Sequence, residues 1–297
     1  MERKQFLKIL SLLPLTGAAM KLNALNKLTS TFDSTEPMPL LFLGHGSPMN
    51  AIEDNEFTRN FRDIGTRFEK PKAILCVSAH WETRGTFLTA MDQPPTIHDF
   101  GGFPKALYDV QYPAPGSPEL AKETMQLIGS TEAALTHKWG LDHGAWSVIK
   151  HLYPDADVPV IEMSIDYTRE PEFHYNLGKE LAALRNKGVL IIGSGNLVHN
   201  LRLVDWENMN TVGYGFDWAV EARTKMNDWI LSGDHKALIQ YKQQGKALEL
   251  AVPTPDHFLP LLYVLGLKNE NDGISLFNDK TMAGSLSMTS VFIQPGQ

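Results

Sequence analysis

The chain has 297 residues, of which 43% are hydrophobic and 21% are charged, and this balance excludes an intrinsically disordered protein. Lys and Arg number 27 against 34 Asp and Glu, which gives a net charge of −7. Nucleic-acid binding needs a clustered basic excess, so we expect no nucleic-acid partner and a small-molecule one instead. At this length one domain can bury a large core.

Residues 1–36 differ in composition from the rest of the chain. Three basic residues precede the apolar run Ile9–Met20, and a polar stretch rich in Ser and Thr follows it, which is the layout of a secretory signal. The run is shorter than the roughly 20 residues that a transmembrane helix needs, so no stable membrane span is expected. We predict a signal peptide or a disordered N-terminal extension over 1–36, with exported or periplasmic protein favoured over cytoplasmic, and one folded domain over 37–297.

Short apolar runs alternate with amphipathic stretches from Pro37 onward. Four runs predict buried strands: Leu40–Leu43, Ala73–Val77, Val158–Met163 and Val189–Ile192. Four stretches predict helices: Asn55–Phe68, Pro118–Ile128, Glu172–Asn186 and Phe216–Leu231. The alternation indicates an α/β fold, a single domain with a central, mostly parallel or mixed β-sheet and helices on both faces. The Pro- and Gly-rich segment Gln93–Ser117 has no periodicity and is expected to be a functional surface loop.

A single cysteine, Cys76, excludes an intramolecular disulfide bond and a cysteine-based zinc site. It lies inside an apolar run, where a buried hydrophobe is a better interpretation than a nucleophile. A metal would therefore need histidine and carboxylate ligands, and the chain has 10 histidines.

Three histidines follow predicted strands. His45 comes after Leu40–Leu43, His80 after Ala73–Val77, and His199 shortly after the strand that ends at Ile192. In open α/β sheets, ligands bind in the crevice beyond the carboxyl ends of the strands. We therefore expect these side chains to converge on one rim.

Three further histidines are candidates. His257 follows Thr254 and Pro255, which are expected to cap and begin an apolar helix that stops near Gly266. His143 lies beside Gly144, with Trp139 and Trp146 nearby, and His98 lies in the long loop. Any one of these taken alone is more often a hydrogen-bonded core or surface residue than a ligand. The remaining four have charged or helical neighbours and are expected to be solvated: His137, His151, His174 and His235.

Other catalytic motifs fail on inspection. Two G-x-G starts, at Gly44 and Gly193, lack the third glycine of a dinucleotide-binding turn, because Met49 and Val198 stand there. The chain has no phosphate-binding P-loop, no H-E-x-x-H and no G-x-S-x-G. Serine catalysis would need Ser47 or Ser194 beside a base and is disfavoured.

Several separated segments together resemble a known family. They are Leu43–Met49, Val77–Trp81, Pro94–Pro104, Asp142–Gly144, Ser194–Asn200 and Pro253–Pro260. In this order they make the chain from Pro37 to the end similar to the 4,5-DOPA dioxygenase branch of the class III extradiol ring-cleaving dioxygenases. One such segment would be a weak signal, whereas the ordered set is specific. The N-terminal extension departs from the usual cytoplasmic members.

The resemblance implies one mononuclear divalent metal held by His45, His80 and His257. It makes His199 either a further metal-site residue or an acid/base, and His143 the other catalytic histidine. Iron(II) is expected for activity and zinc(II) in isolated protein, because zinc also favours histidine ligands. His257 would replace the carboxylate of the usual facial triad, unless Asp256 or Glu82 supplies it.

The expected reaction opens a single-ring, DOPA-like catechol with O2 to a semialdehyde. The aromatic residues Phe100 and Phe103 favour such a planar substrate. Two alternatives stay open: a zinc hydrolase that uses the same histidines, and a non-enzymatic metal-binding interaction protein on the same fold. The sequence gives no indication of the oligomeric state.

Overall fold

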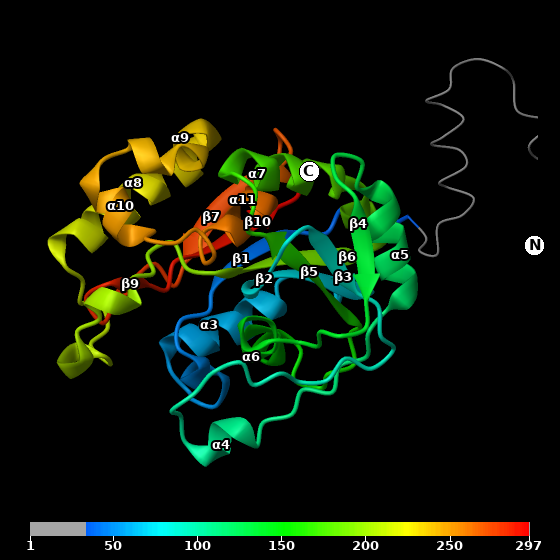
Figure 1. Cartoon of the computed structure of the whole chain (residues 1–297), viewed down its shortest axis with the longest axis horizontal. Helices are drawn as coiled ribbons and strands as arrows, with labels where there is room; N and C mark the ends of the chain where they lie inside the picture. Colours follow the sequence, from blue (N-terminus) through cyan, green and yellow to red (C-terminus); the bar gives the residue numbers. More distant parts are fainter. Residues whose placement is uncertain (1–33, 297) are drawn as a thin grey trace, which may run out of the picture. The chain divides into compact units, whose positions relative to one another are not determined.

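The computed structural model describes residues 34–296 (Figure 1). Nearly all of the predicted signal segment lies outside these residues, so export stays a prediction. Among the helices of residues 34–296, none combines the length and the apolar character that spanning a membrane requires.

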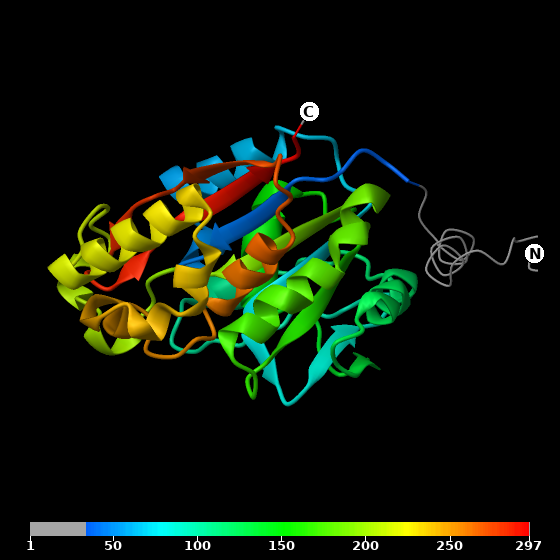
Figure 2. The ribbon, with the colours of Figure 1, turned by 90° about the horizontal axis from the view of Figure 1, so that it is seen from above.

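A mixed eight-stranded sheet forms the centre, in the order β4-β3-β5-β2-β6-β1-β10-β7 (Figures 1 and 2). Its strands are β1 Leu40–Gly44, β2 Ala73–Thr83, β3 Thr86–Thr89, β4 Ala133–Thr136, β5 Val160–Asp166, β6 Val189–Gly195, β7 Gly273–Phe277 and β10 Ser290–Gln294. The short strands β8 (Thr281–Met282) and β9 (Leu286–Ser287) form a separate pair. The order β5-β2-β6-β1 is parallel, whereas β10 is antiparallel to β1 and β7, and β3 is antiparallel to β5. The predicted α/β fold with a mixed sheet is confirmed.

The four strands predicted from the sequence are the four central parallel ones. All residues of β1, β5 and β6 are buried, and strands covered on both faces read as continuous apolar runs. The outer strands gave no such signal, because β4 and β7 are only partly buried. Strand β2 continues six residues past its predicted end, through His80.

Helices cover both faces of the sheet, with α3 and α6 on one face and α7 and α11 on the other (Figures 1 and 2). The helices are α3 Glu56–Gly65, α4 Lys105–Tyr108, α5 Pro118–Leu127, α6 His143–Leu152, α7 Pro171–Glu180, α8 Asp217–Ser232, α9 His235–Ile239, α10 Lys246–Ala251 and α11 Leu259–Gly266. The predicted helix Glu172–Asn186 is two elements, since α7 gives way to the 3₁₀ helix Ala182–Lys187. Helix α6 was not predicted: all but one of its ten residues are buried, so it shows no polar face.

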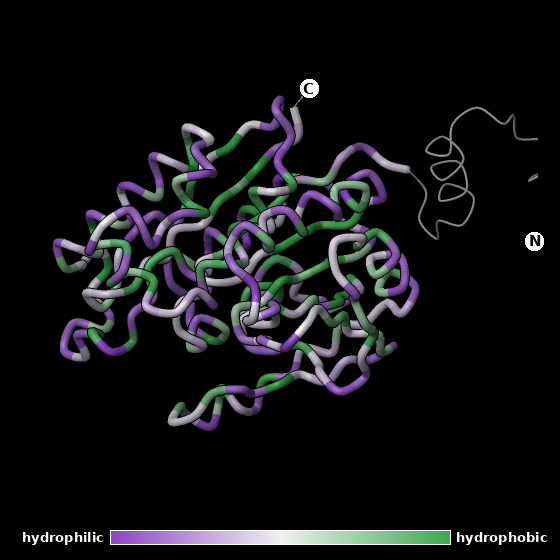
Figure 3. The backbone as a smooth tube through the Cα atoms, turned by 45° about the horizontal axis from the view of Figure 1, so that its top comes forward, coloured by the Kyte–Doolittle hydropathy of each residue, from purple (hydrophilic) through white to green (hydrophobic). Residues whose placement is uncertain are grey.

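The core between the sheet and helices α3 and α6 is apolar. It includes Phe61 of α3, Leu43 of β1 and Trp146 of α6, and Figure 3 shows the hydrophobic segments gathered in the strands inside the molecule. Cys76 belongs to this core and is fully buried, as expected. Burial raises the pKa of its thiol well above the ordinary value, which keeps it a neutral hydrophobe.

One buried ion pair joins the 3₁₀ helix before β6 to the loop between α11 and β7. Arg185 donates to Oδ2 of Asp272 at 2.6 Å, and both side chains are almost fully buried. The same guanidinium donates to the carbonyl oxygens of Met38 and Leu267, so it ties the chain before β1 to the end of α11. Burial alone would raise the pKa of Asp272, but the bond and charge of Arg185, together with backbone N–H bonds from Asn269 and Gly296, outweigh it and hold that pKa below the usual value.

We expect Asp272→Ala to lower the free energy of unfolding by about 3–5 kcal/mol, because it leaves Arg185 as an uncompensated buried charge. The exposed pair of Lys105 and Asp109 offers a matched control, and Asp109→Ala is expected to cost about 0–1 kcal/mol. Denaturant unfolding at neutral pH measures both. The loss of unfolding free energy in Asp272→Ala, relative to the wild type, should shrink as the pH falls through the lowered pKa of Asp272. The protonated acid of the wild type no longer forms an ion pair with Arg185. Equal losses in the two variants would contradict the expectation.

Candidate metal centre

Three of the predicted histidines converge at the carboxyl ends of the central strands. His45 follows β1, His80 lies in β2 and His257 precedes α11, and their potential ligand nitrogens all lie within 4.8 Å of one another. The Nε2 atoms of His45 and His80 are 3.3 Å apart. His45 and His257 are buried, whereas His80 is partly exposed.

Strand register explains the meeting of His45 and His80. Ser194 of β6 pairs with Leu43 of β1 on one side and with Ser78 of β2 on the other. Each histidine stands two residues beyond these partners, and residues two apart on a strand share a face. The sequence suggested that His80 follows the end of its strand, and this prediction was wrong. His80 lies within β2, where the pairing with β5 shifts between Val77 and Glu82.

His257 reaches the group through a turn that docks on the end of β6. Its carbonyl oxygen accepts a hydrogen bond from the backbone N–H of Asn196 at 2.9 Å, and a side chain at Gly195 would clash with that carbonyl. The predicted start of the helix was wrong: α11 begins at Leu259, with Pro260 in its first turn. His257 therefore sits in the preceding turn, where backbone contact with β6 fixes it.

Hydrogen bonds determine which ring nitrogen of His45 is free. Ser194 Oγ donates its only proton to the carbonyl oxygen of Gly144 at 2.6 Å. It must therefore accept the bond that joins it to His45 Nδ1 at 2.9 Å, so His45 carries its proton on Nδ1. The lone pair of His45 Nε2 then faces His80.

A hydrogen bond to Asp256 determines which ring nitrogen of His257 carries the proton. The Asp256 carboxylate accepts a hydrogen bond from His257 Nδ1, which leaves Nε2 of that ring without a proton. A carboxylate or carbonyl behind a histidine is the usual arrangement in metal sites, where it fixes the ring and raises its basicity. Asp256 thus lies behind a ligand candidate, and the exposed Glu82 belongs to none of the potential metal-binding groups of residues 34–296.

The three histidines are neutral. Burial, followed by the charge of neighbouring histidines, lowers the pKa of His45 and His257 well below the ordinary value. Burial also lowers the pKa of His80 to about 3. Neutral imidazole is the form that binds a metal, and three such rings with converging lone pairs suit a divalent ion such as Fe(II) or Zn(II). The residues present therefore fit the divalent metal that the family resemblance implies.

His143 and Asp99 form a pair beside His80. The ring of His143 donates from Nδ1 to Asp99 Oδ2 at 2.9 Å, and its backbone N–H donates to Oδ1 at 2.8 Å. Burial would raise the pKa of Asp99, but these bonds outweigh it and lower that pKa, so the carboxylate is ionised. The arrangement orients the ring, leaves Nε2 free and stabilises a positive charge on it. The ring centres of His143 and His80 are 3.8 Å apart.

Asp99 is a functional candidate that the sequence analysis missed. It stands directly between His98 and Phe100 in the long loop, so the loop was identified but its carboxylate was not. The structure leaves His98 in that loop, where its Nε2 bonds to the carbonyl oxygen of Val110 at 2.9 Å. His98 is in none of the potential metal-binding groups of the described residues.

His199 lies against His257, with parallel rings whose centres are 3.5 Å apart. It groups with Asp256 and His257, not with His45 and His80. Burial lowers its pKa to about 4. Within residues 34–296 its ring has no hydrogen-bond partner. The sequence left its role open between ligand and acid/base, and in the structure it lies against His257, whereas His143 lies against His80.

Two histidines expected to be solvated are buried. His151 bonds to the carbonyl oxygen of Asn50 at 2.7 Å, and His174 bonds to the hydroxyl of Tyr263 at 2.8 Å. The prediction was wrong because these positions face the core from α6 and α7, and a hydrogen bond inside the core replaces solvation. His137 is exposed, and His235 is partly exposed.

Aromatic and apolar side chains lie around the mouth of the site. Phe100 contacts His143 edge-on, with ring centres 5.5 Å apart, and Phe103 lies 5.4 Å from Phe100. A pocket of about 790 Å³ adjoins the turn after His45 and is lined by Phe103 and four methionines among other residues. The pocket is mixed in character, because Glu53, Asp54 and Arg59 line it as well, and no histidine does.

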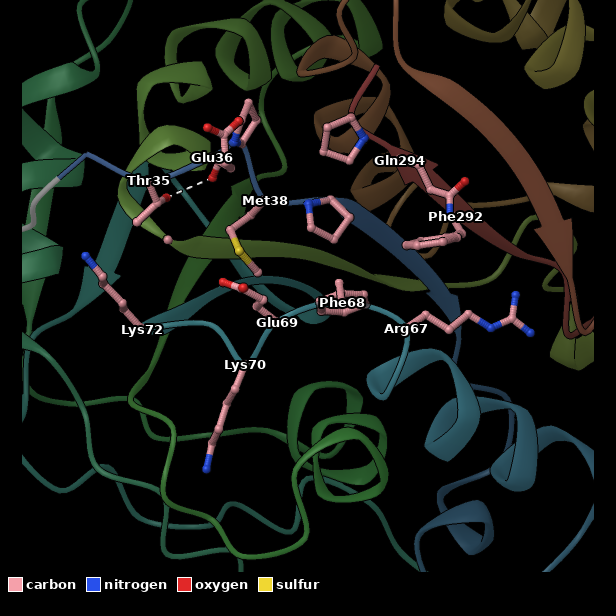
Figure 4. Close-up of a pocket in the computed structure, with 14 residues that line it drawn as sticks. Thr35, Glu36, Met38, Arg67, Phe68, Glu69, Lys70, Lys72, Phe292 and Gln294 are labelled. Atoms are coloured by element: carbon pink, nitrogen blue, oxygen red, sulfur yellow. Dashed lines mark hydrogen bonds between the residues drawn. The ribbon is translucent and has the colours of Figure 1, made fainter. Parts of the chain in front are cut away.

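A second pocket, of about 500 Å³, lies at the opposite ends of the strands (Figure 4). Its lining residues include Met38, just before β1, and Lys72, just before β2. Arg67 and Lys70 extend away from its centre and pair with Asp63 and Asp157. It contains no histidine and takes no part in the metal centre.

Comparison with known proteins agrees with this geometry. Residues 39–289 match the family described as the catalytic LigB subunit of aromatic ring-opening dioxygenase. The chain belongs to this family. It is thus a LigB-type extradiol dioxygenase, an oxidoreductase that uses a metal, and the resemblance inferred from the sequence is confirmed.

Relatives of this LigB-type dioxygenase match it over most of their length. It is 46% identical to the 4,5-DOPA dioxygenase extradiol of Escherichia coli (strain K12), covering 88% of this chain and 96% of the relative. It is 36% identical to the protein of that name from Beta vulgaris, covering 84% and 94%. A crystal structure of an uncharacterized protein from Escherichia coli K12 has 41% identity and a TM-score of 0.74, covering 86% and 99%.

Proposed function

We propose that this dioxygenase holds one Fe(II) ion through His45, His80 and His257 and opens the ring of a single-ring, DOPA-like catechol with O2. The product would be a semialdehyde that contains both oxygen atoms. The observation that carries the proposal is the meeting of three neutral histidines with the oriented His143–Asp99 pair.

The metal follows from the donor set. A bound iron(II) ion would supply the redox chemistry that joins O2 to an aromatic ring, whereas zinc(II) suits the same imidazoles but has no redox activity. We therefore expect zinc to occupy some isolated protein without supporting turnover.

His143 is the proposed general base. Its Nδ1 donates to Asp99, so Nε2 is free to take a proton from a catechol hydroxyl, and the ionised Asp99 stabilises the resulting imidazolium. The same atom can return the proton as the ring opens. His199, beside His257, is a second proton carrier in this proposal, with metal ligation as the alternative role.

The substrate class is supported by two observations. Phe100, which contacts His143, and Phe103 provide flat apolar surfaces for an aromatic ring, and they help to exclude water. Relatives from a bacterium and from plants carry the name 4,5-DOPA dioxygenase extradiol.

Metal exchange tests the proposal. Purified protein stripped of metal and reloaded with Fe(II) under anaerobic conditions should, on addition of DOPA and O2, consume oxygen and form a yellow ring-opened product. Zinc-loaded protein should do neither, because zinc has no redox activity. An oxygen electrode and absorbance spectra measure both. Turnover with zinc without oxygen uptake would instead support the hydrolase, and inactivity with every metal and catechol would support the interaction protein.

A further inference from the structure

Two carboxyl groups are buried beneath the metal centre, and the proposed proton transfer does not use them. Glu162 lies on β5 and Asp142 directly precedes α6, and both are fully buried. No lysine or arginine of residues 34–296 pairs with either. Two unpaired negative charges in a core are very costly. Their protonation is therefore determined by the hydrogen bonds around them.

Counting these bonds shows that one proton is needed. Asp142 Oδ1 accepts from Ser78 Oγ at 2.6 Å and from the backbone N–H of Ala145 at 3.1 Å. Glu162 Oε1 accepts from the backbone N–H of Asp142 at 2.8 Å. The second oxygen of each carboxyl, Asp142 Oδ2 and Glu162 Oε2, is buried and receives no hydrogen bond from residues 34–296, although the two side chains are hydrogen-bonding neighbours. A proton shared between the two carboxyls would give both oxygens a partner.

The surroundings place the proton on Glu162. Asp142 already receives two donors and stands at the N-terminus of α6, where the helix dipole favours a negative charge. Burial raises the pKa of both acids, and that of Glu162, next to the charge of Asp142, lies well above the ordinary value. The other titratable groups that act on the pair are Asp99, His143 and Cys76.

Asp142 holds the parts of the centre together. It caps α6, whose first two residues are His143 and Gly144. The carbonyl of Gly144 accepts the bond from Ser194 that fixes the proton of His45 on Nδ1. Ser78, which donates to Asp142, also accepts a bond from the backbone N–H of His80 at 3.3 Å.

The start of α6 packs closely against His80 at Gly144. A methyl group at Gly144 would come within 2.8 Å of His80 Cδ2. A small shift of the start of α6 would therefore displace both the ligand candidate His80 and the base candidate His143. Whatever fixes Asp142 thus controls the orientation of these histidines.

We propose that Glu162 is a positioning residue that remains a neutral carboxylic acid and donates its proton to Asp142, thereby fixing the start of α6 and, through it, His45 and His143. The inference rests on the proposed function only for the roles of those two histidines. Neither Glu162 nor Asp142 contacts the substrate or the metal in this proposal.

Three variants test it. Glu162→Gln keeps an acceptor for the backbone N–H of Asp142 and offers an N–H to Asp142 Oδ2, so metal affinity and turnover should stay close to those of the wild type. Glu162→Leu removes both bonds and should weaken metal affinity about 10- to 100-fold. Asp142→Asn turns an N–H towards Glu162, which must release its proton to accept it. The buried negative charge then moves from the N-terminus of α6 to β5, where it has fewer donors, so metal affinity should again fall. Met163→Leu, at a fully buried neighbour on β5, is the control for a change of packing.

Infrared spectroscopy supplies a measurement that does not depend on activity. The difference spectrum of wild type minus Glu162→Gln at neutral pH should contain the C=O stretch of one protonated carboxylic acid. The result that would overturn the proposal is the absence of this band. It would also be overturned if Asp142→Asn were tolerated and Glu162→Gln were damaging, since the proton would then be on Asp142. If wild-type protein failed to open any catechol, the band and the metal affinities would still decide the inference.

Discussion

Replacing His45 with alanine is expected to remove most of the bound metal and to abolish ring opening. His45 contributes a buried, neutral imidazole whose Nε2 lone pair faces the other ligand candidates, and alanine offers no donor atom in its place. The apolar core beneath is unchanged, so the fold should survive. Metal analysis after loading with Fe(II), together with circular dichroism, measures the two effects separately.

The controls for this prediction are within the chain. His80→Ala and His257→Ala should behave like His45→Ala, because all three rings belong to one group. His137→Ala changes an exposed histidine outside the site and should keep both metal and activity. Full metal content in all three ligand variants would rule out this set of ligands.

The sequence predicted the frame of the site because buried parallel strands leave a clear pattern. The runs that became β1 and β6 are apolar throughout, and the histidine after β1 lies at the carboxyl edge where α/β sheets bind ligands. Glycine and proline around His45 and His257 marked turns that allow close approach. The positions of these ligand candidates could thus be inferred without coordinates.

The supporting carboxylates could not be inferred in the same way. Asp99 meets His143 from 44 residues away, and Glu162 meets Asp142 across 20 residues, so no local spacing links either pair. An isolated Asp or Glu in a sequence more often lies on the surface than in a core. Tertiary contacts alone distinguish these acids from solvated ones.

The burial of His151 and His174 could not be inferred from the sequence either. Lys150 beside His151 suggested solvent, but it is the one residue of α6 that is not buried. His174 lies on the buried face of α7 together with Leu177 and Gly178. Local charge therefore says little about the burial of one helical residue, because its neighbours in the sequence point elsewhere.

The last prediction concerns the proton carrier. His143→Ala is expected to keep the metal and to lower turnover by about 10²- to 10⁴-fold, which is the usual contribution of a positioned acid or base. The physical reason is that Asp99 orients His143, which lies outside the group of His45, His80 and His257 and meets His80 only in a separate group with Asp99. Its loss should therefore remove a base and leave the three proposed ligands in place. Metal content and turnover per folded molecule, measured on the same Fe(II)-loaded sample, check both parts.

Three outcomes separate the possible roles of His143. Loss of metal together with turnover would make it a ligand, and a lower melting temperature with unchanged turnover would make it a structural residue of the core. Asp99→Asn is the companion variant: it keeps the shape of the side chain but removes the charge that stabilises the imidazolium, so it should lower turnover in the same direction while metal is retained. Normal turnover in both variants would leave the proposed reaction without its base and would shift that role to His199, whose ring is free of hydrogen-bond partners within residues 34–296 and lies beside His257.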